Sequence, residues 1–108
     1  GSTGLGIPDV NLCWEGKEVW VELKVVKGKR VDLSPEQCAW HFRRHRAGGK
    51  SLIIARDKFD GPRKGKGDVI YIWSSRDVVE IQEKGIECPA DFIFHAPFDW
   101  KSIIASIF

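Results

Sequence analysis

The stretch at residues 19 to 25, VWVELKV, constrains most strongly what this chain can fold into. Its apolar residues recur at the spacing of a half-buried strand. Two charged residues, Glu22 and Lys24, project from one face of that strand. Three apolar residues are expected to pack on the other face: Val21, Leu23 and Val25. Because a lone buried charge is costly, the pattern predicts that the two charges pair with each other or hold a metal ion.

A hairpin is expected to bring another carboxylate to this strand. Residues 10 to 14 also alternate, and a tight turn around Gly16 leads into residues 19 to 25. Antiparallel pairing about that turn places Asp9, which follows an irregular glycine-rich segment, opposite residues 22 to 25. The three polar side chains would then meet on one face of the hairpin.

A helix and a buried strand follow. In residues 33 to 37, LSPEQ, Ser34 is the predicted N-cap and Gln37 completes a capping box. The helix is expected to end near Ala47, ahead of the short apolar run at residues 51 to 55. A buried strand after a helix indicates a β-α-β crossover.

The remaining pattern completes an α/β domain with a small mixed sheet flanked by helices. Residues 69 to 73 and 92 to 94 are expected to be strands, and residues 77 to 84 a short helix. Residues 100 to 107 repeat apolar side chains at helical spacing. We expect one domain over residues 1 to 108, with about 86 to 108 as a C-terminal extension.

Composition indicates an intracellular protein. The chain has 17 Lys and Arg against 15 Asp and Glu, a formal charge of +2, so only the local placement of charge is informative. The basic residues cluster in three segments that are expected to form one positive face. Cys13, Cys38 and Cys88 are widely spaced and are expected to be buried thiols in a reducing cytoplasm. No apolar run approaches the length of a membrane span.

The ordered motifs carry a resemblance to a known family. Gly6-Ile7-Pro8-Asp9, then Val21-Glu22-Leu23-Lys24, then Leu33-Ser34-Pro35-Glu36-Gln37, followed by Gly48-Gly49 and an apolar strand, resemble the VRR-NUC nucleases. That family belongs to the PD-(D/E)XK superfamily, so the resemblance implies a restriction-endonuclease-like core. It covers about residues 4 to 57. A lone Glu-x-Lys is not specific, whereas the three motifs in this order are.

The resemblance implies a role for each site residue. Asp9 and Glu22 would be metal ligands with the Leu23 backbone carbonyl, and Lys24 would lie beside the attacking water and the scissile phosphate. Gln37 would support the site from the helix. Hard oxygen ligands suit Mg²⁺ or Mn²⁺. Members of the family usually carry an acidic helix before the first motif, and only eight residues precede Asp9 here, which leaves a second metal position open.

The activity implied is a metal-dependent, structure-specific endodeoxyribonuclease, most similar to the resolvases of four-way (Holliday) junctions, acting in a bacterial or phage-infected cell. Symmetric cutting of two strands implies a homodimer, with the apolar terminal helix as a candidate interface. A nuclease acting on flaps, nicks or single strands remains open, as does a non-catalytic DNA-binding module. We expect basic and imidazole side chains to contact DNA: Lys27, Lys29, Arg30, His41, Arg44, Arg63, Lys64 and Lys66.

The helix at residues 35 to 47 allows other interpretations. Its expected core stripe consists of Cys38, Phe42 and His45, with His41 near the active face. His41 and His45 lie four residues apart and could bind zinc, although no nearby ligand completes such a site. Trp40, among arginines and off the stripe, could stack on a base. Glu22 and Lys24 could also be a simple exposed ion pair.

Overall fold

A computed structural model describes residues 6–58 and 67–108. Five strands form one mixed sheet in the order β1-β2-β3-β4-β5. In chain order the elements are β1 (Val10–Trp14), β2 (Lys17–Val25), α1 (Pro35–Arg46), β3 (Ser51–Asp57), β4 (Val69–Ser74), η2 (Ser75–Asp77), α2 (Val78–Lys84), η3 (Gly85–Glu87), β5 (Phe92–His95) and α3 (Trp100–Ile107). The expected mixed sheet flanked by helices is confirmed.

The hairpin and the crossover lie side by side in the sheet. β1 pairs with β2 in antiparallel register, with Val10 opposite Val21, around a turn at Glu15 and Gly16. β2 and β3 are parallel, with Glu22 beside Ile53, and α1 connects them. β3, β4 and β5 then pair in antiparallel fashion. The predicted β-α-β unit is therefore present, and it places α1 over the charged face of β2.

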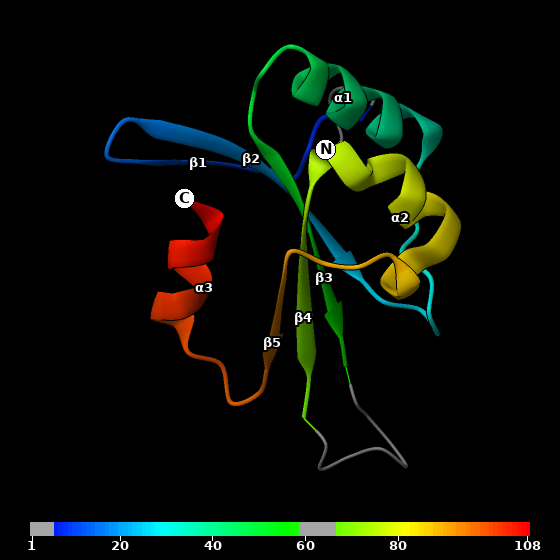
Figure 1. Ribbon diagram of the computed structural model, residues 1–108, viewed down its shortest axis with the longest axis vertical. Helices are drawn as coiled ribbons and strands as arrows, with labels where there is room; N and C mark the ends of the chain where they lie inside the picture. The colour runs from blue at the N-terminus through cyan, green and yellow to red at the C-terminus, as the bar shows by residue number, and fades with distance from the viewer. Residues whose placement is uncertain (1–5, 59–66) are drawn as a thin grey trace.

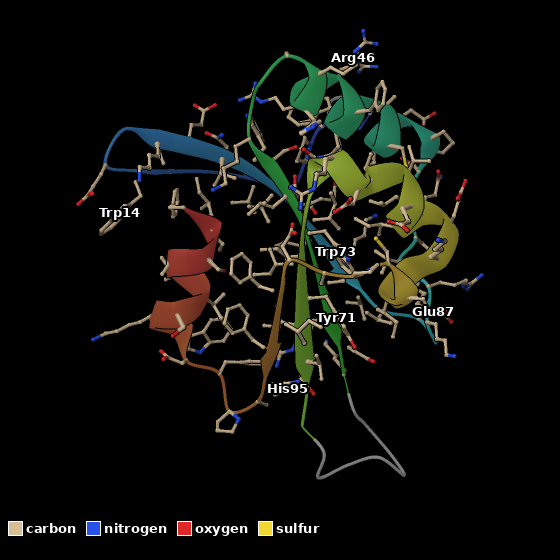
Figure 2. All side chains as sticks on the ribbon, viewed as in Figure 1. Trp14, Arg46, Tyr71, Trp73, Glu87 and His95 are labelled. Atoms are coloured by element: carbon tan, nitrogen blue, oxygen red, sulfur yellow. The ribbon has the colours of Figure 1, made fainter. Side chains whose placement is uncertain are left out.

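Helices cover both faces of the sheet. Figure 1 shows α1 and α2 on one side and α3 on the other. The core under α1 and α2 includes Ile53, Trp73 and Ile81. In Figure 2, Trp73 points from β4 toward α2, and its indole N–H donates a hydrogen bond of 2.9 Å to the Cys88 carbonyl. This bond satisfies the one polar atom of the largest core side chain.

A second core lies under α3. Ile103 and Ile107 of this helix are buried against Val19, Val21 and Leu52 of the sheet. Part of the terminal helix, which was expected as a candidate interface between subunits, is therefore covered by its own chain. β5 extends the sheet just before α3, so the two elements supply both a strand and a covering helix to the fold.

Two expectations about β2 and the cysteines require correction. Val21 is buried, but the side chains of Leu23 and Val25 are 52% and 50% exposed, because the α3 core does not include the C-terminal half of β2. Cys13 lies on an exposed edge strand and is not buried, whereas Cys38 and Cys88 are. All three are free thiols. In the part of the chain that the structure describes, no helix is long and apolar enough to cross a membrane.

Candidate active site

The first turn of α1 is anchored to β2 through one side chain. Ser34 caps the helix by accepting the Gln37 backbone N–H, and Gln37 returns a bond by accepting the Ser34 N–H at 2.9 Å. The same Gln37 oxygen accepts a hydrogen bond of 2.9 Å from Lys24 Nζ. The predicted capping box is present, and it orients Gln37 so that one amide oxygen serves both the helix cap and the lysine.

Glu22 lies beneath this lysine and is almost completely buried, with 1% of its surface exposed. Its Oε2 accepts a hydrogen bond of 3.4 Å from the Gln37 side-chain amide. Its Oε1 lies 3.5 Å from His41 Nε2. Gln37 therefore connects the carboxylate and the lysine, which lie two residues apart on the same face of β2.

Asp9 reaches the site from the start of β1. Its Oδ2 accepts a hydrogen bond of 2.9 Å from the Leu23 backbone N–H. Gly6 allows this approach, because a Cβ there would overlap the Glu36 carbonyl in the first turn of α1, and its φ of +80° favours glycine. The register predicted from the turn is observed, and the structure brings together Asp9, Glu22, Lys24 and Gln37.

The two carboxyl groups differ in their affinity for a proton. Burial raises the pKa of Glu22 above its ordinary value, and the adjacent Asp9 raises it further, although His41 acts against both. Partial burial would raise the pKa of Asp9, but hydrogen bonds from Glu22 and from the Leu23 N–H outweigh it, so this pKa is lowered. Of the two carboxyl groups, Glu22 therefore holds a proton more tightly than Asp9 does.

The residues present fit a hard divalent cation. A carboxyl group that holds its proton more tightly than usual beside a second carboxyl group is a site where a cation can replace that proton. Oε1 of Glu22 is buried and, among the described residues, has no hydrogen-bond partner. No group of three or more His, Cys, Asp and Glu side chains in residues 6–58 and 67–108 is arranged around one point. Two carboxylates and waters are a ligand set that Mg²⁺ accepts, since it keeps several of its waters.

His41 does not lie on the surface where DNA contact was expected. It is completely buried between α1 and the sheet, and its Nδ1 lies 2.9 Å from Ser51 Oγ. Phe42 and His45, expected in the core, are exposed instead. The core face of α1 is thus rotated toward Cys38 and His41. His41 is buried and His45 is exposed, and among the described residues no group of three or more His, Cys, Asp and Glu side chains could hold a zinc ion with them.

The other expected DNA contacts are distributed over the molecule. Lys27, Lys29 and Arg30 are exposed, and Lys29 Nζ lies 3.5 Å from Glu87. Figure 2 shows Glu87, which Lys29 contacts, well separated from Arg46 at the end of α1, so these two described basic segments lie apart. Arg63, Lys64 and Lys66 lie outside the described residues.

A groove of about 250 Å³ is lined by Trp40, Arg43 and Arg44 on the outer side of α1. Trp40 is half-buried, with its ring 5.7 Å from that of Trp20 at an edge-on angle. The Arg44 guanidinium lies 5.7 Å from the Trp40 ring centre and 3.1 Å from Glu18. Arg44 is therefore held in place against an aromatic ring, next to the strand that carries Glu22.

A separate cavity of about 580 Å³ lies beyond the C-terminal end of α1. Its lining includes His45, Lys50, Arg76 and Asp91. None of the four candidate site residues (Asp9, Glu22, Lys24 and Gln37) lines it. Arg76 is bound to Asp91 at 2.7 Å. We therefore place the candidate active site at the carboxylate pair.

Ser51 was not singled out from the sequence, and His41 was assigned a surface role. Gln37 and His41 are four residues apart on α1, a spacing that places both on one face. If Gln37 is expected to face Glu22, this spacing also predicts that His41 faces Glu22. Ser51 has no comparable signal, because only the parallel pairing of β2 and β3 sets it beside His41.

Comparison with protein-family models, with curated proteins and with solved structures finds no match to this chain.

Proposed function

We propose that this protein is a metal-dependent endodeoxyribonuclease with a restriction-endonuclease-like core. The observation that carries the proposal is the pair of adjacent carboxyl groups of Asp9 and Glu22, which lies beside a lysine held by Gln37. Resemblance of the sequence motifs to VRR-NUC nucleases supports the same assignment. A structural ion pair on an edge strand would not require a buried carboxylate with an unsatisfied oxygen.

The proposed reaction is hydrolysis of a DNA phosphodiester. Mg²⁺ or Mn²⁺, held by Asp9, Glu22 and the Leu23 carbonyl, would supply a water of lowered pKa and polarise a phosphoryl oxygen. Water attacks phosphorus, the 3′ oxygen leaves, and the product carries a 5′-phosphate. Lys24 stabilises the negative charge that develops on the phosphate, and Gln37 keeps its ammonium group in place through the 2.9 Å bond.

Branched DNA, four-way junctions in particular, is the substrate we propose first. Symmetric cleavage requires two active sites, and therefore a homodimer. Trp100 and Ile104 are 56% and 52% exposed on the outer side of α3. These two residues, without the buried Ile103 and Ile107, are the proposed contact between the subunits.

Cleavage of flaps or single strands is a second candidate. The groove formed by Trp40, Arg43 and Arg44 favours it, because unpaired bases stack on aromatic side chains and cationic side chains contact the backbone. This groove lies along α1, one to two turns beyond Gln37. A strand that leaves the carboxylate pair could reach it.

The test is cleavage of a labelled four-way junction, a matched linear duplex and a flap, each with Mg²⁺, Mn²⁺ or a chelator. Lys24→Ala is expected to lower the rate by at least about a hundredfold, since it removes one preorganised charge from the reacting phosphate. Lys101→Ala, an exposed lysine on α3, is the matched control and is expected to leave the rate unchanged.

The outcomes separate the candidates. Paired nicks in the junction that require metal and Lys24 would support the resolvase. Cleavage of the flap alone would keep the nuclease and exclude the junction as substrate. Junction binding without cleavage of any substrate, under either metal, would support the non-catalytic binding module.

A further inference from the structure

We infer that His41 and Ser51 form a positioning relay behind the carboxylate pair, which orients Glu22 for divalent metal and sets the metal affinity of the site. The inference rests on the proposed function, because it takes Glu22 to be a ligand. It starts from two atoms, Glu22 Oε1 and His41 Nε2. Both are buried, both lack a hydrogen-bond partner among the described residues, and they lie 3.5 Å apart.

The two facing atoms are buried, which makes their lack of a hydrogen bond unusual. His41 and Glu22 are 0% and 1% exposed, so water does not reach the two facing atoms from the surface. Most buried polar atoms in proteins have a hydrogen-bond partner, and an unsatisfied pair that faces each other indicates a contact that is completed in another state of the site. Hydrogen bonds in active sites are often long without a ligand and shorten when it binds.

Ser51 contacts the other ring nitrogen of His41, so the direction of this hydrogen bond decides which nitrogen carries the proton. Its hydroxyl lies 2.9 Å from Nδ1 of His41, and Ser51 itself is 1% exposed. When the hydroxyl donates to Nδ1, the ring proton is on Nε2, where it points at Glu22 Oε1. A carboxylate that binds metal through Oε2 would then accept this N–H through Oε1, which fixes its orientation.

Gln37 and His41 hold Glu22 from two adjacent turns of α1. The Gln37 amide donates to Oε2 at 3.4 Å, and His41 faces Oε1. Both side chains come from one helix face, and the helix is held to β2 through Lys24. The geometry of the carboxylate is therefore set by α1 as a unit, with Ser51 of β3 as the fixed end of the relay.

The first measurement is Mn²⁺ binding by titration calorimetry to the full chain, without DNA. Partners that orient a metal ligand change affinity by about tenfold to a hundredfold when they are removed. We expect Ser51→Ala to weaken Mn²⁺ binding by about tenfold and His41→Ala by more. His41→Gln keeps an amide that can donate toward Glu22 and is expected to recover part of the loss. His45→Gln, an exposed histidine on the same helix, is the matched control.

The second measurement is the imidazole nitrogen spectrum of the protein, which has 3 histidines. Addition of Mg²⁺ is expected to shift the Nε2–H resonance of His41, and Ser51→Ala is expected to change its ring tautomer. A purely structural role for His41 would alter stability without changing metal affinity in the folded protein or responding to Mg²⁺.

The two proposals fail differently. Wild-type protein that binds Mn²⁺ with the same affinity as folded Ser51→Ala and His41→Ala would overturn the relay and leave the nuclease assignment intact. Wild-type protein that binds no Mn²⁺ at Asp9 and Glu22 would overturn both.

Discussion

Glu22 is a carboxyl group that the fold holds out of water, while its neighbour Asp9 remains at the surface. Burial raises the pKa of Glu22, so the folded protein binds this proton more tightly than the unfolded chain does. A group of this kind favours folding at low pH and opposes it above its folded pKa. The position is therefore a source of instability, as is expected of a ligand in the proposed metal site.

Replacing Glu22 tests this at the residue scale. In chelator at about pH 8, Glu22→Gln is expected to raise the free energy of unfolding by about 1 kcal/mol, because no buried charge with an unsatisfied oxygen remains. At about pH 3 the carboxyl is largely protonated in both states, and the gain should largely disappear. Urea unfolding at the two pH values measures the difference.

Glu83→Gln, on the exposed face of α2, is the control for that comparison. An equal gain for Glu22→Gln at both pH values would contradict the interpretation, since the effect would then not come from ionisation of the buried carboxyl group.

At the scale of single elements, the N-terminus of α1 joins helix stability to the site. Ser34 and Gln37 exchange two hydrogen bonds, and Gln37 also binds Lys24. Loss of the cap would therefore loosen the residue that holds the lysine. The β1–β2 hairpin also joins local structure to the site, because its register places Asp9 beside Glu22.

Ser34→Ala is expected to lower the free energy of unfolding by about 1 kcal/mol, the usual effect of losing an N-cap side chain. Ser34→Asp keeps a capping oxygen and should retain most of the stability. Urea unfolding of the two variants measures this. If alanine and aspartate behave alike, the capping interaction contributes little to the stability of α1.

The hairpin turn offers a stabilising change. Glu15 has a φ of 49° and Gly16 a φ of 78°, both in the left-handed region. Asparagine adopts this conformation more readily than glutamate, and Asn-Gly is the preferred pair for such a turn. Glu15→Asn is expected to raise the free energy of unfolding by about 0.5 kcal/mol. A loss of stability in thermal unfolding would show that the Glu15 side chain is itself needed.

At the scale of the whole molecule, helices from different parts of the chain cover the two faces of the sheet. α1 and α2 lie on the face that carries Glu22, and α3 covers the opposite face (Figure 1). The apolar residues of α3 are therefore divided between the interior and the surface. Ile103 and Ile107 point inward, whereas Trp100 and Ile104 remain exposed.

This division predicts different effects for neighbouring isoleucines. Ile103→Ala is expected to lower the free energy of unfolding by about 2–4 kcal/mol through a cavity under α3. In protein diluted until it is monomeric, Ile104→Ala should change it by less than about 0.5 kcal/mol. Equal losses in chemical unfolding of the monomer would contradict the division of α3 into a buried and an exposed side.

The proposed homodimer makes a related prediction for Ile104. In sedimentation experiments at micromolar concentration the wild-type chain is expected to be a dimer, and Ile104→Ser is expected to shift it toward monomer. Ser102→Ala, on the same helix, is the control. A wild-type monomer would count against paired cutting of a junction.

Local chemistry was enough to predict much of the candidate site. The Ser34 capping box, the Gly16 turn and the alternation in β2 depend on hydrogen bonds and side-chain directions within a few residues. These interactions are encoded in adjacent positions, so the register that brings Asp9 to Glu22 follows from them. The catalytic and metal-binding roles of these residues remain predictions.

By itself, the sequence determined most of the strands and helices and that Asp9, Glu22 and Lys24 come together, while the place of Gln37 beside them was implied by the family resemblance. Only the tertiary structure decided that His41 is buried against Ser51, that Leu23 and Val25 stay exposed, and that α3 covers its own sheet. Periodicity identifies the faces of an element but not the surface that covers each face. That choice depends on contacts between segments far apart in the chain, which no local pattern records.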